Sequence, residues 1–170
     1  MLGSEIKKLL EDQVKHEFHS AYIYLGMHTY YAGKNLNGFA NWFDVQVKEE
    51  CDHGRLMLQY LLNNGEVAEF SAIDAITSDY DSFRAPLEEA YKHEVLITEK
   101  INRIYEAAYS AKDFRTLRFL DWFIQEQGEE EKNVDDLIKR YDLFGKDSQG
   151  LYQLDTELAA RVYTAPSLVL

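Results

Sequence analysis

Cysteine is nearly absent from this 170-residue sequence, which contains only Cys51. A single cysteine can form neither a disulfide framework nor a cysteine-based zinc or rubredoxin site. Long apolar runs are also missing, because no stretch of about eighteen apolar residues occurs that could cross a membrane. The first residues, MLGSEIKKLL, lack the apolar core of a signal peptide. We therefore expect a soluble, cytoplasmic protein with no membrane partner.

Positive charge is scarce as well, since 18 lysines and arginines stand against 30 aspartates and glutamates, a net charge of −12. This balance argues against nucleic acid as a partner and is compatible with cations as ligands. Only two prolines and nine glycines occur, and 46% of the residues are hydrophobic, which excludes disordered and collagen-like chains. The length predicts one domain, residues 1–170, with a sizeable core.

Helical periodicity fills most of the chain, and cap and turn residues divide it into four long helices and a short one. The four long helices are expected from a Ser4 cap to Gly33, from Asn35 to Asn63-Asn64-Gly65, from a Ser82 cap to Ser110, and from Asp113 to about Leu143. Pro86 is tolerated in the first turn of the third helix. A shorter fifth helix is expected within residues 147–163. No strand alternation is present, so the sequence predicts an all-α bundle.

Residues 65–82 show no sustained periodicity and form a long connection between the second and third helices. Eighteen residues can span about 60 Å when extended, far more than a hairpin between adjacent helices needs. We therefore expect the connection to cross the length of the bundle, so that the second and third helices run parallel.

Each long helix carries a glutamate inside its apolar stripe, the row of side chains at spacings of three and four that faces the core. In the second helix this stripe runs through Phe39, Phe43, Gln46, Glu50, His53 and Met57. The four stripe glutamates are Glu17, Glu50, Glu94 and Glu130. At roughly 1.5 Å of rise per residue, their carboxylates fall within about two turns of one level.

Four carboxylates buried at one level cannot all stay ionised without cations. Two divalent ions would supply four positive charges, with His53 as a neutral nitrogen ligand, and such an oxygen-rich site suits iron or manganese. Glu50 and His53, at i and i+3, face one point and form a chelating pair. Taken singly, an acidic run is more often a solvated surface, and a buried histidine is more often a hydrogen-bonded core residue. The coincidence across four helices favours a metal centre.

This set of residues resembles the ferroxidase centre of the bacterial non-haem ferritins, and the resemblance extends over essentially the whole chain. The motifs that carry it are Glu17 with Tyr24, Glu50-x-x-His53, Glu94, and Gln127-x-x-Glu130. The resemblance implies a ferritin-like four-helix bundle with a long crossover between helices two and three and a short fifth helix. It also implies that twenty-four subunits close a hollow shell, in which iron is stored as a ferric oxyhydroxide mineral.

The resemblance further implies a ligand set for a di-iron centre. Glu17 and His53 become ligands of the first iron, and Glu50 becomes a bridge between the two irons. Glu94 and Glu130 become ligands of the second iron. At this centre the protein would act as a ferroxidase, because dioxygen or hydrogen peroxide would oxidise the bound Fe(II).

Gln127, by the same resemblance, lies beside the dioxygen-binding region, and Tyr24 is a nearby hydrogen-bonding and redox partner. The spacing Gln127-x-x-Glu130 departs from the bacterioferritins, which repeat Glu-x-x-His there. Cys51 stands where bacterioferritins carry a haem-ligating methionine, so we expect no haem. Two alternatives stay open. One is a di-iron oxygenase or rubrerythrin-type peroxidase without mineral storage, and the other is a structural bundle whose acidic cluster is incidental.

Three further glutamates, Glu49, Glu126 and Glu129, stand one position beside stripe residues and project from the flank of the bundle. Glu126 and Glu129 are neighbours at i and i+3, and Glu49 joins them if the second and fourth helices lie side by side. We predict a third, weaker, all-carboxylate iron site here, which the resemblance also supports. The alternative is a solvated acidic face.

Several aromatic residues lie off the apolar stripes: Tyr30, Trp42, Phe119 and Trp122. Surplus apolar surface normally marks interfaces between subunits. We therefore expect a large closed homo-oligomer, with the fifth helix at a symmetry axis.

Overall fold

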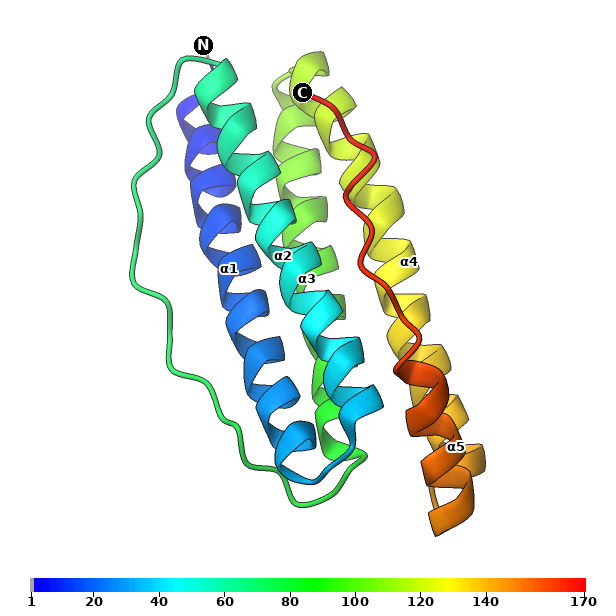
Figure 1. The fold of residues 1–170 in the computed structure, drawn as a ribbon. Coiled ribbons are helices and arrows are strands. Elements are labelled where there is room, and N and C mark those ends of the chain that lie inside the picture. The colour runs from blue at the N-terminus through cyan, green and yellow to red at the C-terminus, as the bar shows by residue number, and fades with distance from the viewer. Residues whose placement is uncertain (1) are drawn as a thin grey trace.

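Five α-helices make up the computed structural model, which describes residues 2–170 (Figure 1). They are α1 (Ser4–Gly33), α2 (Asn37–Asn63), α3 (Ala85–Ser110), α4 (Phe114–Phe144) and α5 (Ser148–Leu158). No strand occurs in the described residues. The long helices form two antiparallel pairs, α1 with α2 and α3 with α4, that pack into one bundle. The predicted all-α bundle is confirmed.

The connection between α2 and α3 crosses the whole length of the bundle, along the outer side of α1 (Figure 1). It lies close against α1, because Lys15 forms an ion pair with Asp74 at 3.3 Å, and Glu11 accepts a hydrogen bond from the Glu69 amide. At Gly26 of α1, a Cβ would come within 2.6 Å of a backbone oxygen of the connection. The predicted crossover is therefore confirmed, and α2 and α3 run parallel.

The ends of the helices agree with the predictions only in part. Asp113 caps α4 as expected, and its carboxylate accepts a hydrogen bond from the Thr116 amide. Ser4 is not a cap, because it is the first residue inside α1 and its side chain forms no cap hydrogen bond. Asn35 lies in the preceding turn at a φ of 60°, so α2 begins after it. Ser82 precedes a turn, and α3 begins beyond that turn.

The core of the bundle is divided into two apolar clusters by a layer of polar side chains. One cluster fills the end of the bundle that holds the turn between α1 and α2, and it is rich in aromatic rings. Tyr31 stacks on Phe39 and Phe43 there, with ring centroids 5.0 and 5.7 Å apart. The other cluster, at the opposite end, is mainly aliphatic. The stripe glutamates lie between the two clusters, where the periodicity predicted them.

Helix α5 packs against the start of α2, where the amides of Gly38 and Phe39 donate to the Asp155 carboxylate at 2.8 and 3.0 Å. The approach is so close that a Cβ at Gly38 would lie 1.6 Å from the Asp155 carbonyl oxygen. After α5, residues 159–170 run back along the bundle toward its opposite end (Figure 1). No helix in residues 2–170 is long and apolar enough to cross a membrane.

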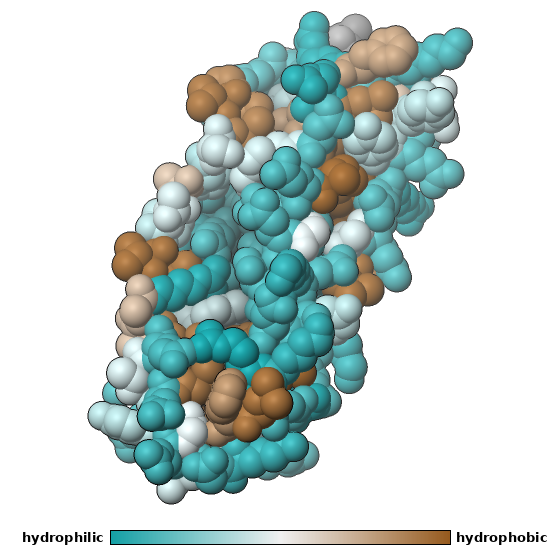
Figure 2. Space-filling view, turned by 90° about the vertical axis from the view of Figure 1, so that its right-hand side faces the viewer, coloured by the Kyte–Doolittle hydropathy of each residue, from teal (hydrophilic) through white to brown (hydrophobic). Residues whose placement is uncertain are grey.

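The aromatic residues that were expected at interfaces are largely covered within one chain. Tyr30, Trp42 and Phe119 are all buried. Tyr30 packs against Tyr80 of the connection, and the segment after α5 covers Trp42, so neither ring marks a free surface. On the face shown in Figure 2, apolar side chains form separate groups among hydrophilic ones. The basis given for the oligomer prediction is therefore wrong at these three residues.

Candidate metal centre

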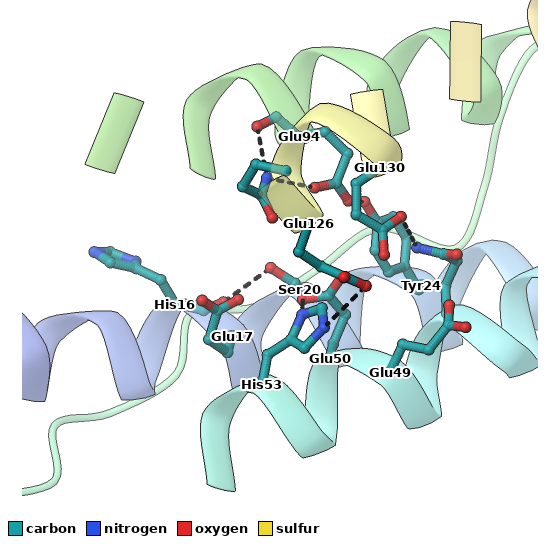
Figure 3. A network of polar contacts seen from close by, with 12 residues as sticks. His16, Glu17, Ser20, Tyr24, Glu49, Glu50, His53, Glu94, Glu126 and Glu130 are labelled. Carbon is teal, nitrogen blue, oxygen red and sulfur yellow. Dashed lines mark hydrogen bonds and ion pairs between the residues drawn. The ribbon is translucent and has the colours of Figure 1, made fainter. Parts of the chain in front are cut away.

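The polar layer gathers polar and ionisable side chains from all four long helices around one point (Figure 3). Each comes from the middle of its helix, and each is at most 3% exposed: Glu17, Glu50, His53, Glu94, Gln127 and Glu130. Their placement follows from helix periodicity, because every one occupies a stripe position that an apolar residue would otherwise fill.

Glu17, Glu50 and His53 form one half of the candidate metal centre. One ligand atom of each lies within 4.8 Å of the other two, and His53 Nδ1 is 3.7 Å from Glu50 Oε2. Glu17 Oε1 accepts a hydrogen bond from Gln13 Nε2 at 2.8 Å. Glu17 Oε2 is buried and has no hydrogen-bond partner among the described residues. A buried oxygen without a partner is costly, and a cation bound there would remove that cost.

Glu94 and Glu130 form the other half, and neutral side chains hold both carboxylates in place. Glu94 accepts hydrogen bonds from the Tyr24 hydroxyl and from Gln127 Nε2, the latter at 3.1 Å. Glu130 Oε2 accepts from Gln46 Nε2 at 2.9 Å. These donors fix the orientation of each carboxylate and leave its other lone pairs free for a metal ion.

Burial raises the pKa of all four glutamates. The pKa of Glu94 rises to about 7 and that of Glu130 to about 8, and the pKa of Glu50 lies well above its ordinary range. The neighbouring carboxylates push the values for Glu50 and Glu130 further up. Within residues 2–170, none of the four forms an ion pair with a lysine or arginine. No basic side chain would compensate these carboxylates when they ionise, and two divalent cations would balance their charge.

The three flanking glutamates predicted for a third site lie in different surroundings. Glu126 Oε1 is 3.9 Å from His53 Nε2, and together with Glu130 these residues could also hold an ion. Glu49 is about one-fifth exposed and pairs with Arg161 at 2.7 Å. Glu129 is exposed, with only a 3.4 Å contact from a side chain of its own helix. The structure thus brings Glu49 and Glu126 beside the buried layer and leaves Glu129 at the surface.

Three residues of this centre were given no role by the sequence patterns. Gln13 and Gln46 are buried stripe positions, and each donates to a carboxylate of the layer. A polar residue inside a stripe, four positions from a stripe glutamate, could have indicated them. Arg161 lies beyond α5 in a segment without periodicity, so nothing in the pattern pointed to it.

Comparison with known proteins gives consistent results. A family profile described as a ferritin-like domain matches residues 7–144. The chain is 36% identical to a probable bacterial non-heme ferritin-like protein of Haemophilus influenzae over 158 residues, covering 93% of this chain and 96% of that protein. It is 35% identical to a bacterial non-heme ferritin of Staphylococcus aureus over 163 residues, covering 96% and 98%.

Solved structures show the same similarity in three dimensions. An open pore ferritin from the hyperthermophilic archaeon Archaeoglobus fulgidus aligns with a TM-score of 0.93 at 36% identity, covering 95% of this chain and all of that one. An engineered closed form of the Archaeoglobus fulgidus ferritin aligns with a TM-score of 0.94 at 36% identity, covering 96% and 100%. The predicted ferritin-like fold is confirmed.

Proposed function

Because the chain belongs to the ferritin family, we propose that it is a ferroxidase that oxidises Fe(II) and stores the ferric product inside a closed homo-oligomeric shell. The observation that carries this proposal is the buried layer of four glutamates and one histidine. In the part of the chain that the structure describes, this layer has no lysine or arginine partner and includes an unpartnered oxygen on Glu17. The proposal includes a shell of twenty-four subunits and a cytoplasmic location.

Fe(II) is the substrate of the proposed reaction, and each glutamate has a role in binding it. Glu17 and His53 bind the first ion, Glu50 lies between the two ions, and Glu94 and Glu130 bind the second. Since burial raises the pKa of Glu94 to about 7 and that of Glu130 to about 8, Glu130 is mostly protonated and Glu94 about half protonated at neutral pH before iron arrives. Binding of Fe(II) therefore releases protons.

Oxidation then requires one electron from each of the two ions. Dioxygen accepts both electrons and two protons and leaves as hydrogen peroxide, while water hydrolyses the two ferric ions to oxo or hydroxo species and further protons are released. Gln127 holds Glu94 in place through its amide group and lies beside the position proposed for dioxygen. Tyr24, also bonded to Glu94, is the proposed redox partner. The third site at Glu49, Glu126 and Glu129 receives iron on its way to the store.

The rate at which the Glu50→Ala variant oxidises Fe(II) tests this proposal, because Glu50 is the ligand placed between both ions. Anaerobic protein would be loaded with two Fe(II) per chain, mixed with dioxygen, and followed by absorbance in a stopped-flow instrument. Glu50→Ala should lose the rapid phase, whereas Glu106→Ala, which removes an exposed glutamate of α3, should retain it. Wild-type kinetics in Glu50→Ala would overturn the di-iron assignment. Size measurement of both variants checks that assembly is unchanged.

A further inference from the structure

The segment after α5 is tied to the bundle at three heights along its length. The Asn41 side chain donates to the carbonyl oxygen of Arg161 at 2.9 Å. Further along, the Tyr163 hydroxyl donates to Asp52, and Trp122 Nε1 donates to Ser167 Oγ at 3.0 Å. Residues 159–170 therefore lie in a defined position along α2 and α4 (Figure 1), and Arg161 of this segment contacts Glu49 of α2.

The guanidinium group of Arg161 is the cation that this segment brings to the metal centre. It lies over the Trp42 ring, 4.5 Å from the ring centroid, and Nη1 donates to the Trp42 carbonyl oxygen at 3.1 Å. Nη2 donates to two acceptors, Gln46 Oε1 at 2.6 Å and Glu49 Oε2 at 2.7 Å. A planar group with this many partners is held much more firmly than a surface ion pair.

The contact with Gln46 extends the influence of Arg161 into the buried layer. A guanidinium group has only donors, so the atom of Gln46 that faces it must be the amide oxygen. The amide nitrogen is then directed inward, where it donates to Glu130 Oε2 at 2.9 Å. Arg161, Gln46 and Glu130 thus form a chain of hydrogen bonds from the bundle surface to a proposed ligand of the second iron.

The contact with Glu49 disfavours the binding of a metal ion, whereas the contact with Gln46 supports a metal ligand. Glu49 is the predicted third-site carboxylate nearest to Arg161, and the guanidinium already neutralises it. Arg161 occupies Glu49 Oε2, so a cation that binds this oxygen must displace the guanidinium, and a cation that binds the other oxygen is repelled by its positive charge at close range. The stronger the hold of Arg161, the weaker the third site.

We propose that Arg161 is a positioning residue for iron binding. Its guanidinium group competes with a third cation for Glu49 and holds the Gln46 amide toward Glu130. The inference rests on the proposed function, because it concerns metal ions bound at the same centre. It makes the segment after α5 a determinant of how iron distributes between the buried pair and the flanking site.

Zn(II) titrations of the fully assembled protein test the competition, since Zn(II) binds without redox chemistry. Calorimetry would compare the wild type with Arg161→Gln, and the third step is identified as the one that Glu49→Gln removes. In Arg161→Gln this step should tighten by roughly 10- to 100-fold, the value of a charge-assisted hydrogen bond, while binding at the buried pair weakens. A merely structural defect would weaken both. Arg140→Gln, which removes an arginine paired with Glu157 of α5, is the matched control and should change neither step.

A third step in Arg161→Gln that is weaker than in the wild type, or within twofold of it, would overturn the inference. Crystals of the wild type soaked in graded Zn(II) give a second test that needs no variant. Anomalous diffraction should show the guanidinium displaced wherever a metal occupies Glu49 Oε2, and a metal bound to that oxygen beside an unmoved Arg161 would also overturn the inference. Failure of the wild type to bind Zn(II) at the buried pair would instead contradict the proposed function.

Discussion

Replacing Glu130 with glutamine should stabilise the metal-free protein at neutral pH, although it removes a proposed metal ligand. Burial, reinforced by Glu94, raises the pKa of Glu130 from its ordinary value of 4.5 to about 8. Between pH 4.5 and 7 this carboxyl ionises in the unfolded chain but keeps its proton in the folded one. Folding stability then falls as pH rises, by about 1.4 kcal/mol per pH unit, or about 3 kcal/mol by pH 7. Glutamine carries no such penalty, and its amide oxygen can still accept from Gln46.

Thermal unfolding of metal-free protein, followed by calorimetry at equal protein concentrations, measures this difference. Glu130→Gln should melt at a higher temperature than the wild type at pH 7, and the gain should shrink as pH falls toward 4.5. Glu129→Gln, an exposed neighbour, should melt like the wild type at both pH values. With saturating Zn(II) the order should reverse, because the wild type gains more from binding. A variant no more stable than the wild type at pH 7, or equally stabilised at pH 5, would refute the reasoning.

Three further predictions address other parts of the chain. The hydrogen bond from Tyr24 lowers the pKa of Glu94, so Tyr24→Phe should weaken Zn(II) binding more at pH 6.5 than at pH 8.5; equal losses at both values would contradict this. Glu49→Ala should leave the first fast oxidation of two Fe(II) nearly intact and change only later turnover, measured by oxygen consumption during repeated additions. At Gly38 a Cβ would lie 1.6 Å from a backbone oxygen of α5, so Gly38→Ala should lower the free energy of unfolding by about 1–3 kcal/mol, measured by thermal unfolding. Gly33→Ala, where nothing lies within 4 Å, is the control and should melt no lower than the wild type.

The buried layer was predictable because helix periodicity fixes which side chains share a face. Glu17, Glu50, Glu94 and Glu130 each interrupt an apolar stripe, and the regular rise of a helix sets their common level. The crossover was predictable for a similar reason, since the length of residues 65–82 far exceeds what a hairpin needs. Which iron each residue binds stays a prediction.

The remaining features depend on contacts between segments that are distant in the sequence. Tyr30 and Trp42 lie off the stripes, yet the connection and the segment after α5 cover them, and a pattern confined to four helices does not include that cover. Arg161 contacts Glu49 although the two residues are 112 positions apart in the sequence, and Arg161 lies in a segment with no periodicity. The Ser4 prediction was wrong because the first helical hydrogen bond already reaches the carbonyl oxygen of Gly3, which places Ser4 inside the helix.

Iron counted on sedimenting particles tests the proposed storage function most directly. The protein would be exposed to excess Fe(II) in air and then sedimented, with iron and protein measured in the same fractions. The proposal predicts a large closed assembly that carries far more iron per chain than the buried pair and the third site can hold together. Iron that never exceeds the capacity of those sites, or a chain that sediments as a 19.8 kDa monomer, would contradict it.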